Sequence, residues 1–316
     1  MIVHTGEALI DFIPTIDSSD RNAYTPVPGG SPYNTAVATA RLEVPNAFFG
    51  RISTDFFGDQ LVTHLQQNGV GQDYILRDAR LSTLAFVKRS KTGEARYAFF
   101  AENAADRAVT KGDLPVLPED VLAIQFGSIA MIADPVGASI LAWVQREHGR
   151  RVISFDPNIR DTLIVDEAAY RERVLAAISA STVVKISDED LAWIFGGSDA
   201  DSTARKILSD GPDLVVVTSG AEGAAGYNQT GKVSVPARKV TVADTVGAGD
   251  SFHGGILAWL YHNNRLSITE IGKLAEEDLE TMLQFATAVS AGTCSRPGND
   301  PPRLRELQEL QQLQEY

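Results

Sequence analysis

The sequence predicts an α/β protein, in which helices cover both faces of a mostly parallel β-sheet. Short β-branched or aromatic runs alternate with longer segments of helical periodicity through most of the 316 residues. An apolar content of 44% and a charged content of 22% are typical of globular proteins, so we expect a sizeable core. The length is about twice a ~150-residue domain unit, which indicates one large domain or a domain with an accessory piece.

The expected strands and helices follow one another along the chain. Strand segments are rich in β-branched and aromatic residues and cover 2–11, 46–51, 121–127, 151–156, 183–186 and 214–218. Helix segments carry apolar residues at three- and four-residue steps and cover 32–42, 57–68, 135–149, 167–179 and 202–209. Leucines recur every three residues in the tail 303–316, which predicts one short packed helix.

Two segments, 15–27 and 80–101, lack helical periodicity. The second has the pattern of a strand, a turn at 91–93 and another strand, so the two segments predict a small β layer beside the main sheet. An ordinary surface hairpin is one interpretation. The aromatic side chains Phe86, Tyr97, Phe99 and Phe100 favour a lid over a cleft. We therefore expect a main domain of residues 1–14, 28–79 and 102–316, with residues 15–27 and 80–101 inserted as a β lid.

The charge balance and the single cysteine limit the partners and the compartment. Lys and Arg total 28 against 41 Asp and Glu, and the net charge of −13 opposes binding to nucleic acid or to an anionic membrane. Cys294 alone cannot close an intrachain disulfide or form a zinc site. Acidic residues interrupt the apolar run at the N-terminus, so neither a signal peptide nor a membrane span is predicted, and we expect a cytoplasmic protein.

The most informative segment is ADTVGAGDSFHGG at 243–255, which an apolar helix follows. Gly247, Ala248 and Gly249 stand where a loop enters that helix, so their N–H groups can converge on an anion. Asp250 comes next, in the first helical turn. An acid there is ordinarily a helix cap, but beside an anion hole it is placed to take a proton from a hydroxyl during phosphoryl transfer.

Two long motifs resemble a known family. DTVGAGDSFHGG is similar to the second signature of the PfkB, or ribokinase-like, carbohydrate kinases, and GGSPYNTAVATARL with GRISTDFFGDQL resembles the first. The resemblance extends from about residue 2 to about residue 300. It implies a three-layer α/β/α domain with a small β-sheet lid, transfer of a phosphoryl group from MgATP to a hydroxyl of a small sugar, and homodimers that pack through their lids.

The resemblance also assigns the sugar site. Asp250 matches the family's catalytic base, and Gly247, Ala248 and Gly249 match its anion hole. Asp11 matches an acid that binds sugar hydroxyls, Gly29 and Gly30 a hinge beneath the lid, and Asn34 a substrate amide. Without the family, Asp11 would be a solvated strand end and Asn34 an ordinary helix residue. Asn103 of NAADRAV and Arg160 of DPNIR are also assigned to the substrate, Arg160 because it can meet a phosphate or an acidic group.

Nucleotide and metal contacts are implied for the C-terminal half. Thr218, Gly220 and Gly223 match a family motif that lies along ATP, and Lys185 follows the preceding strand. For the acid that orders Mg²⁺ the family has Asn-x-x-Glu, whereas this chain has Ser187 and Asp190, so Asp190 or Glu189 is the candidate. A K⁺ site is implied at Asp244, Val246, Arg296 and Gly298.

Several alternatives remain open. GYNQTGK at 226–232 has P-loop spacing, but Val233 follows it and its flanks predict a hairpin, so we reject a P-loop. The histidines lack metal-ligand spacing, and His253 is interpreted as a structural helix residue. Within the family the sequence is most similar to fructokinases. The alternatives are a 2-keto-3-deoxygluconate kinase, in which Arg160 or Arg107 would meet the carboxylate, and a binding protein without turnover.

Overall fold

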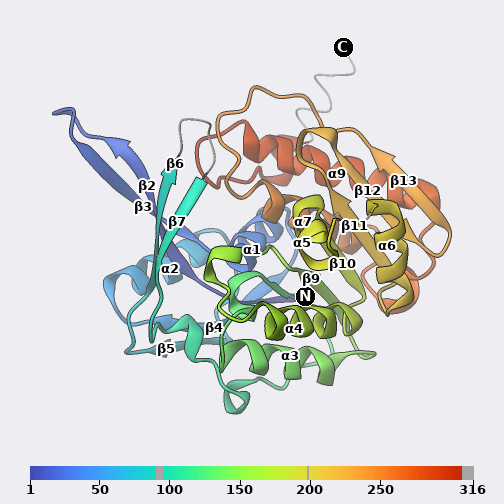
Figure 1. Cartoon of the computed structure of the whole chain (residues 1–316), viewed down its shortest axis with the longest axis horizontal. Coiled ribbons are helices and arrows are strands. Elements are labelled where there is room, and N and C mark those ends of the chain that lie inside the picture. Colours follow the sequence, from blue (N-terminus) through green and yellow to red (C-terminus); the bar gives the residue numbers. More distant parts are fainter. Residues whose placement is uncertain (90–94, 198, 308–316) are drawn as a thin grey trace.

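The computed structural model of the chain describes residues 1–89, 95–197 and 199–307. Nine strands form a large sheet in the order β13-β12-β11-β10-β9-β8-β1-β4-β5, and four form a small sheet in the order β3-β2-β6-β7 (Figure 1). The large sheet comprises β1 (Ile2–Thr5), β4 (Asn46–Ser53), β5 (Ile75–Asp78), β8 (Ala123–Gly127), β9 (Val152–Asp156), β10 (Val183–Ser187), β11 (Leu214–Thr218), β12 (Ala224–Asn228) and β13 (Gly231–Val235). The small sheet comprises β2 (Leu9–Ile16), β3 (Asn22–Gly29), β6 (Thr83–Arg89) and β7 (Ala95–Phe100).

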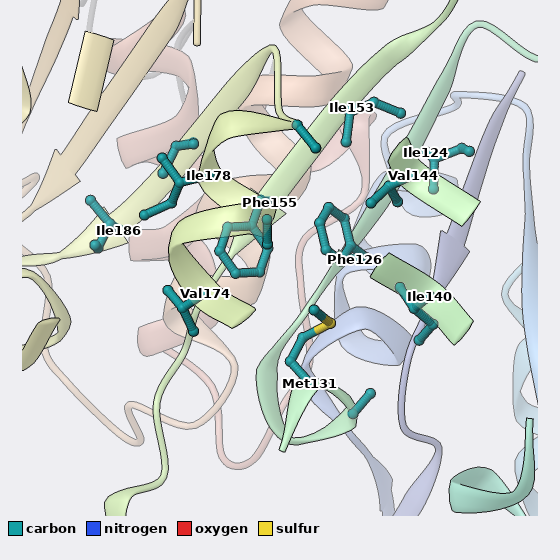
Figure 2. Close-up of a cluster of buried hydrophobic side chains, with 14 of the residues drawn as sticks. Ile124, Phe126, Met131, Ile140, Val144, Ile153, Phe155, Val174, Ile178 and Ile186 are labelled. Carbon is teal, nitrogen blue, oxygen red and sulfur yellow. The ribbon is translucent and has the colours of Figure 1, made fainter. Parts of the chain in front are cut away.

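Helices cover both faces of the large sheet, so the predicted three-layer α/β/α architecture is confirmed. One face packs against α1 (Ser31–Arg41), α2 (Phe56–Gln67), α7 (Ala248–His262), α8 (Ile268–Ile271) and α9 (Glu276–Cys294). The other packs against α3 (Val136–Glu147), α4 (Glu167–Ser179), α5 (Asp188–Phe195) and α6 (Ala200–Ser209). Figure 2 shows the second interface, where the stacked rings of Phe126 and Phe155 lie between Val174 and Ile140.

The prediction of a single strand at 2–11 is wrong, because this segment forms two strands in two different sheets. β1 pairs in parallel with β4 and β8 of the large sheet, whereas β2 pairs with β3 and β6 of the small one. The chain turns at Gly6, where φ is 152° and an added Cβ would lie 2.4 Å from Pro32 Cγ. Apolar residues stand on both sides of this turn, at 2–3 and 8–10, which is why the segment is predicted as a single strand. Asp11 consequently lies within a strand of the small sheet instead of at the end of a strand of the main sheet.

The other expected strands and helices are confirmed with ends that shift by at most two residues. No range is predicted from the sequence for β5, β12, β13, α5, α8 or α9. β12 and β13 form an antiparallel hairpin across 226–232, which agrees with the rejection of a P-loop there. The turn expected at 91–93 lies outside the described residues, as does most of the tail, of which 304–307 are helical.

The small sheet rises beside the large one and extends away from it in Figure 1. Its strands enter and leave the main domain near Gly29, Thr83 and Phe100. Within the described part of the chain, no helix is both long and apolar enough to cross a membrane.

Candidate active site

Two cavities lie side by side where the β-strands of the large sheet end and α7 begins. The first has a volume of about 230 Å³ and is lined from the small sheet, α1 and the ends of β9 and β10. The second, of about 610 Å³, is lined by the loop after β11, the segment 236–242 and one side of α7 and α9. Thr245 and Gly249 line both cavities, so the two meet at the first turn of α7. Clefts at the carboxyl ends of parallel strands are the usual ligand sites of open α/β sheets.

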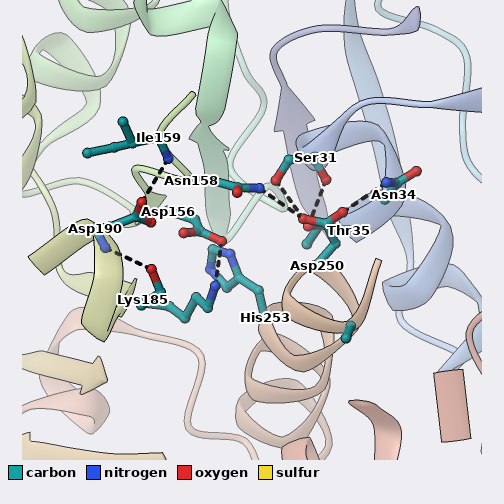
Figure 3. Close-up of polar contacts among 12 residues, drawn as sticks. Ser31, Asn34, Thr35, Asp156, Asn158, Ile159, Lys185, Asp190, Asp250 and His253 are labelled. Atoms are coloured by element: carbon teal, nitrogen blue, oxygen red, sulfur yellow. Dashed lines mark hydrogen bonds and ion pairs between the residues drawn. The ribbon is translucent and has the colours of Figure 1, made fainter. Parts of the chain in front are cut away.

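Asp250 lies at this junction and is 7% exposed. Ser31 Oγ donates to its Oδ1 over 2.6 Å, and Asn34 Nδ2 donates to its Oδ2 over 2.8 Å. Asn158 Nδ2 adds a weaker bond to Oδ1 at 3.4 Å (Figure 3). Burial raises the pKa of the Asp250 carboxyl, which Ser31 and Asn34 oppose by donating to its ionised form. The carboxylate is therefore fixed in direction and has a raised affinity for a proton.

The start of α7 leaves amide donors beside Asp250. Gly247 has φ 74°, and a Cβ on it would lie 1.9 Å from Asn299 Oδ1, so only glycine fits there. The Ala248 N–H donates to the Thr245 carbonyl at 3.2 Å. Helix geometry leaves the following amides, those of Gly249 and Asp250, without an intrahelical acceptor. Gly247, Ala248 and Gly249, the residues expected to form an anion hole, therefore lie where the two cavities meet.

Asp11 lines the first cavity from β2 of the small sheet. A Cβ on Gly29 would lie 2.1 Å from Asp11 Oδ2, so this glycine leaves the space that the carboxyl fills. Burial raises the pKa of Asp11 to about 7, although Arg160 acts to lower it. Gly30, with φ 111°, is the N-cap of α1 and also lines the cavity.

Glu7 is a site residue that the sequence analysis missed. It lines the first cavity, and its carboxylate accepts the Ser31 N–H at 2.9 Å and the Ala130 N–H at 3.2 Å. Burial raises its pKa to about 7. Glu7 thereby ties the start of α1, and with it Ser31, to the loop after β8. The sequence feature that could have identified Glu7 is an acidic residue within the apolar N-terminal segment.

Of the two other residues assigned to the substrate, the structure brings only one to the cavity. The Arg160 guanidinium lies 5.9 Å from the centre of the Tyr97 ring, and its Nη1 donates to Asn158 Oδ1 at 2.7 Å. Both Arg160 and Tyr97 line the first cavity. Asn103 is exposed, accepts a hydrogen bond from Arg80 Nε at 3.3 Å, and lines neither cavity. Its assignment to the substrate rests on the NAADRAV motif, whose first side chain lies at the surface.

Lys185, which lines the first cavity, belongs to a buried ion pair. Lys185 Nζ donates to Asp156 Oδ2 at 3.0 Å, and both residues are under 5% exposed. Burial lowers the pKa of Lys185, but the adjacent Asp156 carboxylate outweighs this and raises it overall. A Cβ on Gly249 would lie 3.2 Å from Lys185 Nζ, so the ammonium faces the first turn of α7. Asp156 Oδ1 is buried without a hydrogen-bond partner among the described residues.

The two candidates for the Mg²⁺-ordering acid differ in environment. Asp190 is buried and accepts the Ile159 N–H at 3.0 Å, whereas Glu189 is exposed. Burial and, to a smaller extent, the neighbouring Asp156 carboxylate raise the pKa of Asp190 to about 6. Among the residues that the structure describes, no group of three or more His, Cys, Asp or Glu side chains could hold a metal ion by itself. A divalent ion here would need additional ligands from a substrate.

The second cavity contains the expected nucleotide motif together with residues that the sequence analysis missed. Thr218 ends β11, and Gly220 and Gly223 follow it in the cavity wall. A Cβ on Gly223 would lie 2.1 Å from the Val235 carbonyl oxygen, so the hairpin packs directly on this glycine. The missed lining residues come from three separate parts of the chain and include Lys239, Val242, Phe252, Thr287 and Cys294. No local motif marks such residues, because only the fold brings them together.

The Asp244 carboxylate joins the loop before α7 to the loop after α9. Its Oδ1 accepts the N–H groups of Thr245 and Val246 at 2.8 and 3.2 Å, and its Oδ2 accepts that of Gly298 at 3.2 Å. Three of the four residues expected at a K⁺ site are therefore neighbours. The fourth, Arg296, directs its side chain to Glu306 at 3.0 Å and to Asp300.

Comparisons with known proteins identify similar sequences and structures over nearly the whole chain. The sequence profile described as "pfkB family carbohydrate kinase" matches residues 1–305. A fructokinase of Rhizobium leguminosarum bv. trifolii is 43% identical over 279 residues, covering 88% of this chain and 85% of that protein. The crystal structure of a fructokinase with bound ATP from Xylella fastidiosa superposes with a TM-score of 0.91 at 29% identity, covering 100% of this chain and 99% of the other. A Vibrio cholerae fructokinase mutant with fructose, ADP and potassium bound has a TM-score of 0.85 at 27% identity, covering 98% and 97%.

Proposed function

The chain belongs to the pfkB family of carbohydrate kinases, and from this premise we propose that it is an ATP-dependent fructokinase. Fructose would occupy the first cavity and ATP the second, with the γ-phosphate at the first turn of α7. The observation that carries this assignment is that Thr245 and Gly249 line both cavities immediately beside Asp250. An acceptor hydroxyl and a phosphate held in the two cavities would meet at that point.

Asp250 would act as the general base. Its carboxylate is held by Ser31 and Asn34 on the side of the first cavity, and burial raises its pKa. A base with a raised pKa accepts a proton more readily as the sugar oxygen attacks phosphorus. The proton of the hydroxyl passes to Asp250, the oxygen forms a bond to the γ-phosphorus, and ADP departs with the electrons of the broken P–O bond.

Lys185 and the amides at the start of α7 would stabilise the phosphoryl group in transfer. Directed N–H donors and a fixed ammonium in a site that excludes water lower the energy of the charge that develops on the phosphoryl oxygens. The Lys185 ammonium faces Gly249 and is kept in place by Asp156. This role fits the −13 net charge of the chain, because local donors and not the overall charge determine whether an anion binds.

A magnesium ion bound with ATP would screen the charges of its phosphates. Mg²⁺ is usually held by one or two carboxylates together with substrate phosphates and water. Asp156 supports this proposal because its buried Oδ1 is a hard oxygen donor without a partner among the described residues. Asp190 lies close enough to Asp156 for its own pKa to respond, whereas Glu189 is exposed, so we favour Asp190 over Glu189 as the acid that orders the ion.

A potassium ion is proposed near Asp244. Its support is that the hydrogen bonds of one carboxylate bring the loop before α7 and the loop after α9 together at Val246 and Gly298. The carbonyl groups of such loops are the ligands that a monovalent cation would use. Arg296 would contribute through its backbone only, since its side chain pairs with Glu306.

A 2-keto-3-deoxygluconate kinase is the second candidate, because Arg160 in the first cavity could meet a substrate carboxylate. The neighbouring Asp11 makes this less favourable, since its carboxyl would repel an acidic substrate when ionised. Arg107, the other cation considered, lines neither cavity. Asp11 and Asn34 instead suit the vicinal hydroxyls of a neutral sugar.

We also propose a homodimer that packs through the small sheets. The face of this sheet that lies away from Tyr97 and Phe99 carries Phe12 and Phe86, whose rings stack at 4.4 Å. Ile16, Tyr24 and Phe100 are 59%, 47% and 63% exposed, which is unusual for large apolar side chains on one small sheet. Light scattering at micromolar concentration tests this.

The compartment we propose is the reducing cytoplasm, because a protein with a single cysteine does not depend on an intrachain disulfide.

The substrate is tested by measuring ADP release across a panel of fructose, glucose, ribose, a nucleoside and 2-keto-3-deoxygluconate. We expect the highest kcat/KM with fructose and K⁺ and Mg²⁺ present. A higher value for 2-keto-3-deoxygluconate would replace fructose with the acidic sugar. Binding of fructose and ATP by calorimetry without any ADP release would instead identify a sensor, and would reject the kinase proposal.

A further inference from the structure

Three adjacent strands in the middle of the large sheet carry a row of buried polar side chains. His4 on β1 is in register with Gln125 on β8, which is in register with Ser154 on β9, and all three are 0% exposed. Two positions earlier, each strand contributes a residue to the apolar core under α7 and α9: Ile2, Ala123 and Val152. The row therefore points to that face. Strands buried on both faces usually read as continuous apolar runs, so a polar row at this place needs a physical reason.

His253 completes the row from the helix above it. Its Nε2 lies 2.7 Å from Ser154 Oγ, and His4 Nδ1 lies 2.9 Å from Gln125 Oε1. Burial lowers the pKa of both histidines to about 3. Both rings are consequently neutral near pH 7, and each has one nitrogen that donates and one that accepts. Such rings hold a geometry by directed hydrogen bonds and add no charge to the site.

The Ser154–His253 bond joins the two elements that carry the reacting groups. His253 follows Asp250 by three residues, which places both on one side of α7. Ser154 precedes Asp156 by two residues, which places both on one face of β9. Figure 3 shows the His253 ring between the Asp156–Lys185 pair and the helix that bears Asp250. One hydrogen bond thus connects the strand of the ion pair to the helix of the base.

The remaining contacts of this helical turn restrain it sideways. A Cβ on Gly254 would lie 2.9 Å from Ala38 Cβ of α1, and one on Gly255 would lie 2.8 Å from Ala286 Cα of α9. α7 is therefore in close backbone contact with a helix on either side. His253 makes a hydrogen bond toward the sheet. This bond fixes the position of the turn that bears Asp250 relative to Asp156.

We infer that His253 is a positioning residue for phosphoryl transfer, which holds Asp250 in place relative to Asp156 and Lys185 through its hydrogen bond to Ser154. This inference rests on the proposed kinase function. A displacement of a reacting group by a fraction of an ångström slows the chemical step more than it weakens ground-state binding. His253 itself lines neither cavity, so it acts only through the placement of Asp250.

A matched pair of substitutions tests the bond. In His253→Gln the side-chain amide can reach the position of Nε2, whereas in His253→Asn it reaches only the position of Nδ1, away from Ser154. We expect kcat for the best sugar to fall about 10- to 100-fold in His253→Asn, with both KM values within about twofold, and to recover largely in His253→Gln. Equal kcat in the two variants, or a change confined to KM, would overturn the inference.

Two further measurements separate positioning from folding and from the proposed function. Ser154→Ala is expected to lower kcat about as much as His253→Asn does. The double variant is expected to lose no more of its kcat than either single variant, because the same hydrogen bond is lost in all three. Additive losses would contradict this. His262→Asn is the control: its ring bonds the Leu42 carbonyl at the far end of α7, and its kcat is expected to stay unchanged. Ser154→Ala is also expected to shift the imidazole ¹⁵N resonances of His253 and not those of His262. This readout holds even if the wild type phosphorylates no sugar, and unmoved His253 resonances would reject the bond.

Discussion

Ser31 Oγ and Asp250 Oδ1 are joined by a hydrogen bond of 2.6 Å, although 219 residues separate them in the chain. The bond connects the N-terminus of α1 to the first turn of α7. Gly30, the cap of α1, directly follows the last residue of β3 in the small sheet. A movement of the small sheet relative to α1 would therefore be transmitted to the hydroxyl that orients the Asp250 carboxylate.

Replacement of Asp250 by Asn is expected to lower kcat by about 10²- to 10⁴-fold, because an amide cannot take the proton of the sugar hydroxyl. The Kd for ATP is expected to stay within about threefold, since the second cavity is unchanged. Initial rates of ADP formation and calorimetric titration with ATP measure both quantities. Near-normal turnover in Asp250→Asn would remove Asp250 from the role of base.

Ser31→Ala is the matched comparison for that variant. It keeps the carboxylate but removes its shortest hydrogen bond, so we expect a loss in kcat of about 10-fold, well below that of Asp250→Asn. A loss as large as that of Asp250→Asn would show that Ser31 does more than orient the base.

Gly29→Ala is expected to weaken fructose binding without a change in ATP binding. The added Cβ would lie 2.1 Å from Asp11 Oδ2, so the carboxyl has to leave its place in the first cavity. We expect the Kd for fructose to rise about 10-fold or more, as it should in Asp11→Ala, where a hydrogen-bonding group is lost. Gly112→Ala is the control, because its nearest neighbour, Thr110 Oγ1, lies 3.7 Å away. An unchanged Kd in Gly29→Ala and Asp11→Ala would exclude Asp11 from the site.

The α/β architecture and the centre of the site could be predicted because both leave local patterns. The alternation of apolar runs and helical periods identified β4, β8 to β11 and α1 to α4 almost to their ends. Gly247 to Asp250 are consecutive and lie in one loop and one helical turn, so a single segment of the sequence indicates their chemistry. The two motifs also assign Asn34 and Asp250 to one substrate site, and a 2.8 Å hydrogen bond joins their side chains in the structure.

The missed features depend on contacts between distant segments. Apolar residues stand on both sides of Gly6, at 2–3 and 8–10, and their pattern does not show that the two runs belong to different sheets. Glu7 and Asp156 become site residues because their carboxyls meet Ser31 and Lys185 in three dimensions. Asn103 is the opposite case, because it was assigned to the substrate and its side chain does not reach the first cavity. A segment can resemble a family motif without directing each of its side chains into the cavity.

Asp106→Asn is expected to make the free energy of unfolding less sensitive to pH. Asp106 is buried, accepts a 2.6 Å hydrogen bond from Thr83 Oγ1 at the base of β6, and burial raises its pKa from 3.8 to about 6. The folded protein thus holds this proton more tightly than the unfolded chain. Its contribution is complete below about pH 4 and is lost as the pH rises through 6, a change of about 3 kcal/mol.

Urea unfolding at several values between pH 4.5 and 7.5 measures this effect. The free energy of unfolding of Asp106→Asn minus that of the wild type is expected to rise with pH, because the amide does not ionise. Glu119→Gln, at an exposed acid, is expected to give a difference that does not change with pH. A flat difference for Asp106→Asn would mean that Asp106 does not titrate in this range.

Cys294 provides a direct probe of the second cavity. Its thiol is the only one in the chain, lies in the cavity wall, and has a pKa that burial and Asp244 raise. We expect saturating ATP to slow alkylation by iodoacetamide at pH 8 about 10-fold or more, whereas fructose, which would occupy the first cavity, leaves the rate unchanged. Alkylation in urea, where the cavity is lost, is the control and should be indifferent to ATP. Equal protection by fructose, or none by ATP, would show that the nucleotide does not occupy the cavity that Thr218 and Phe252 help to form.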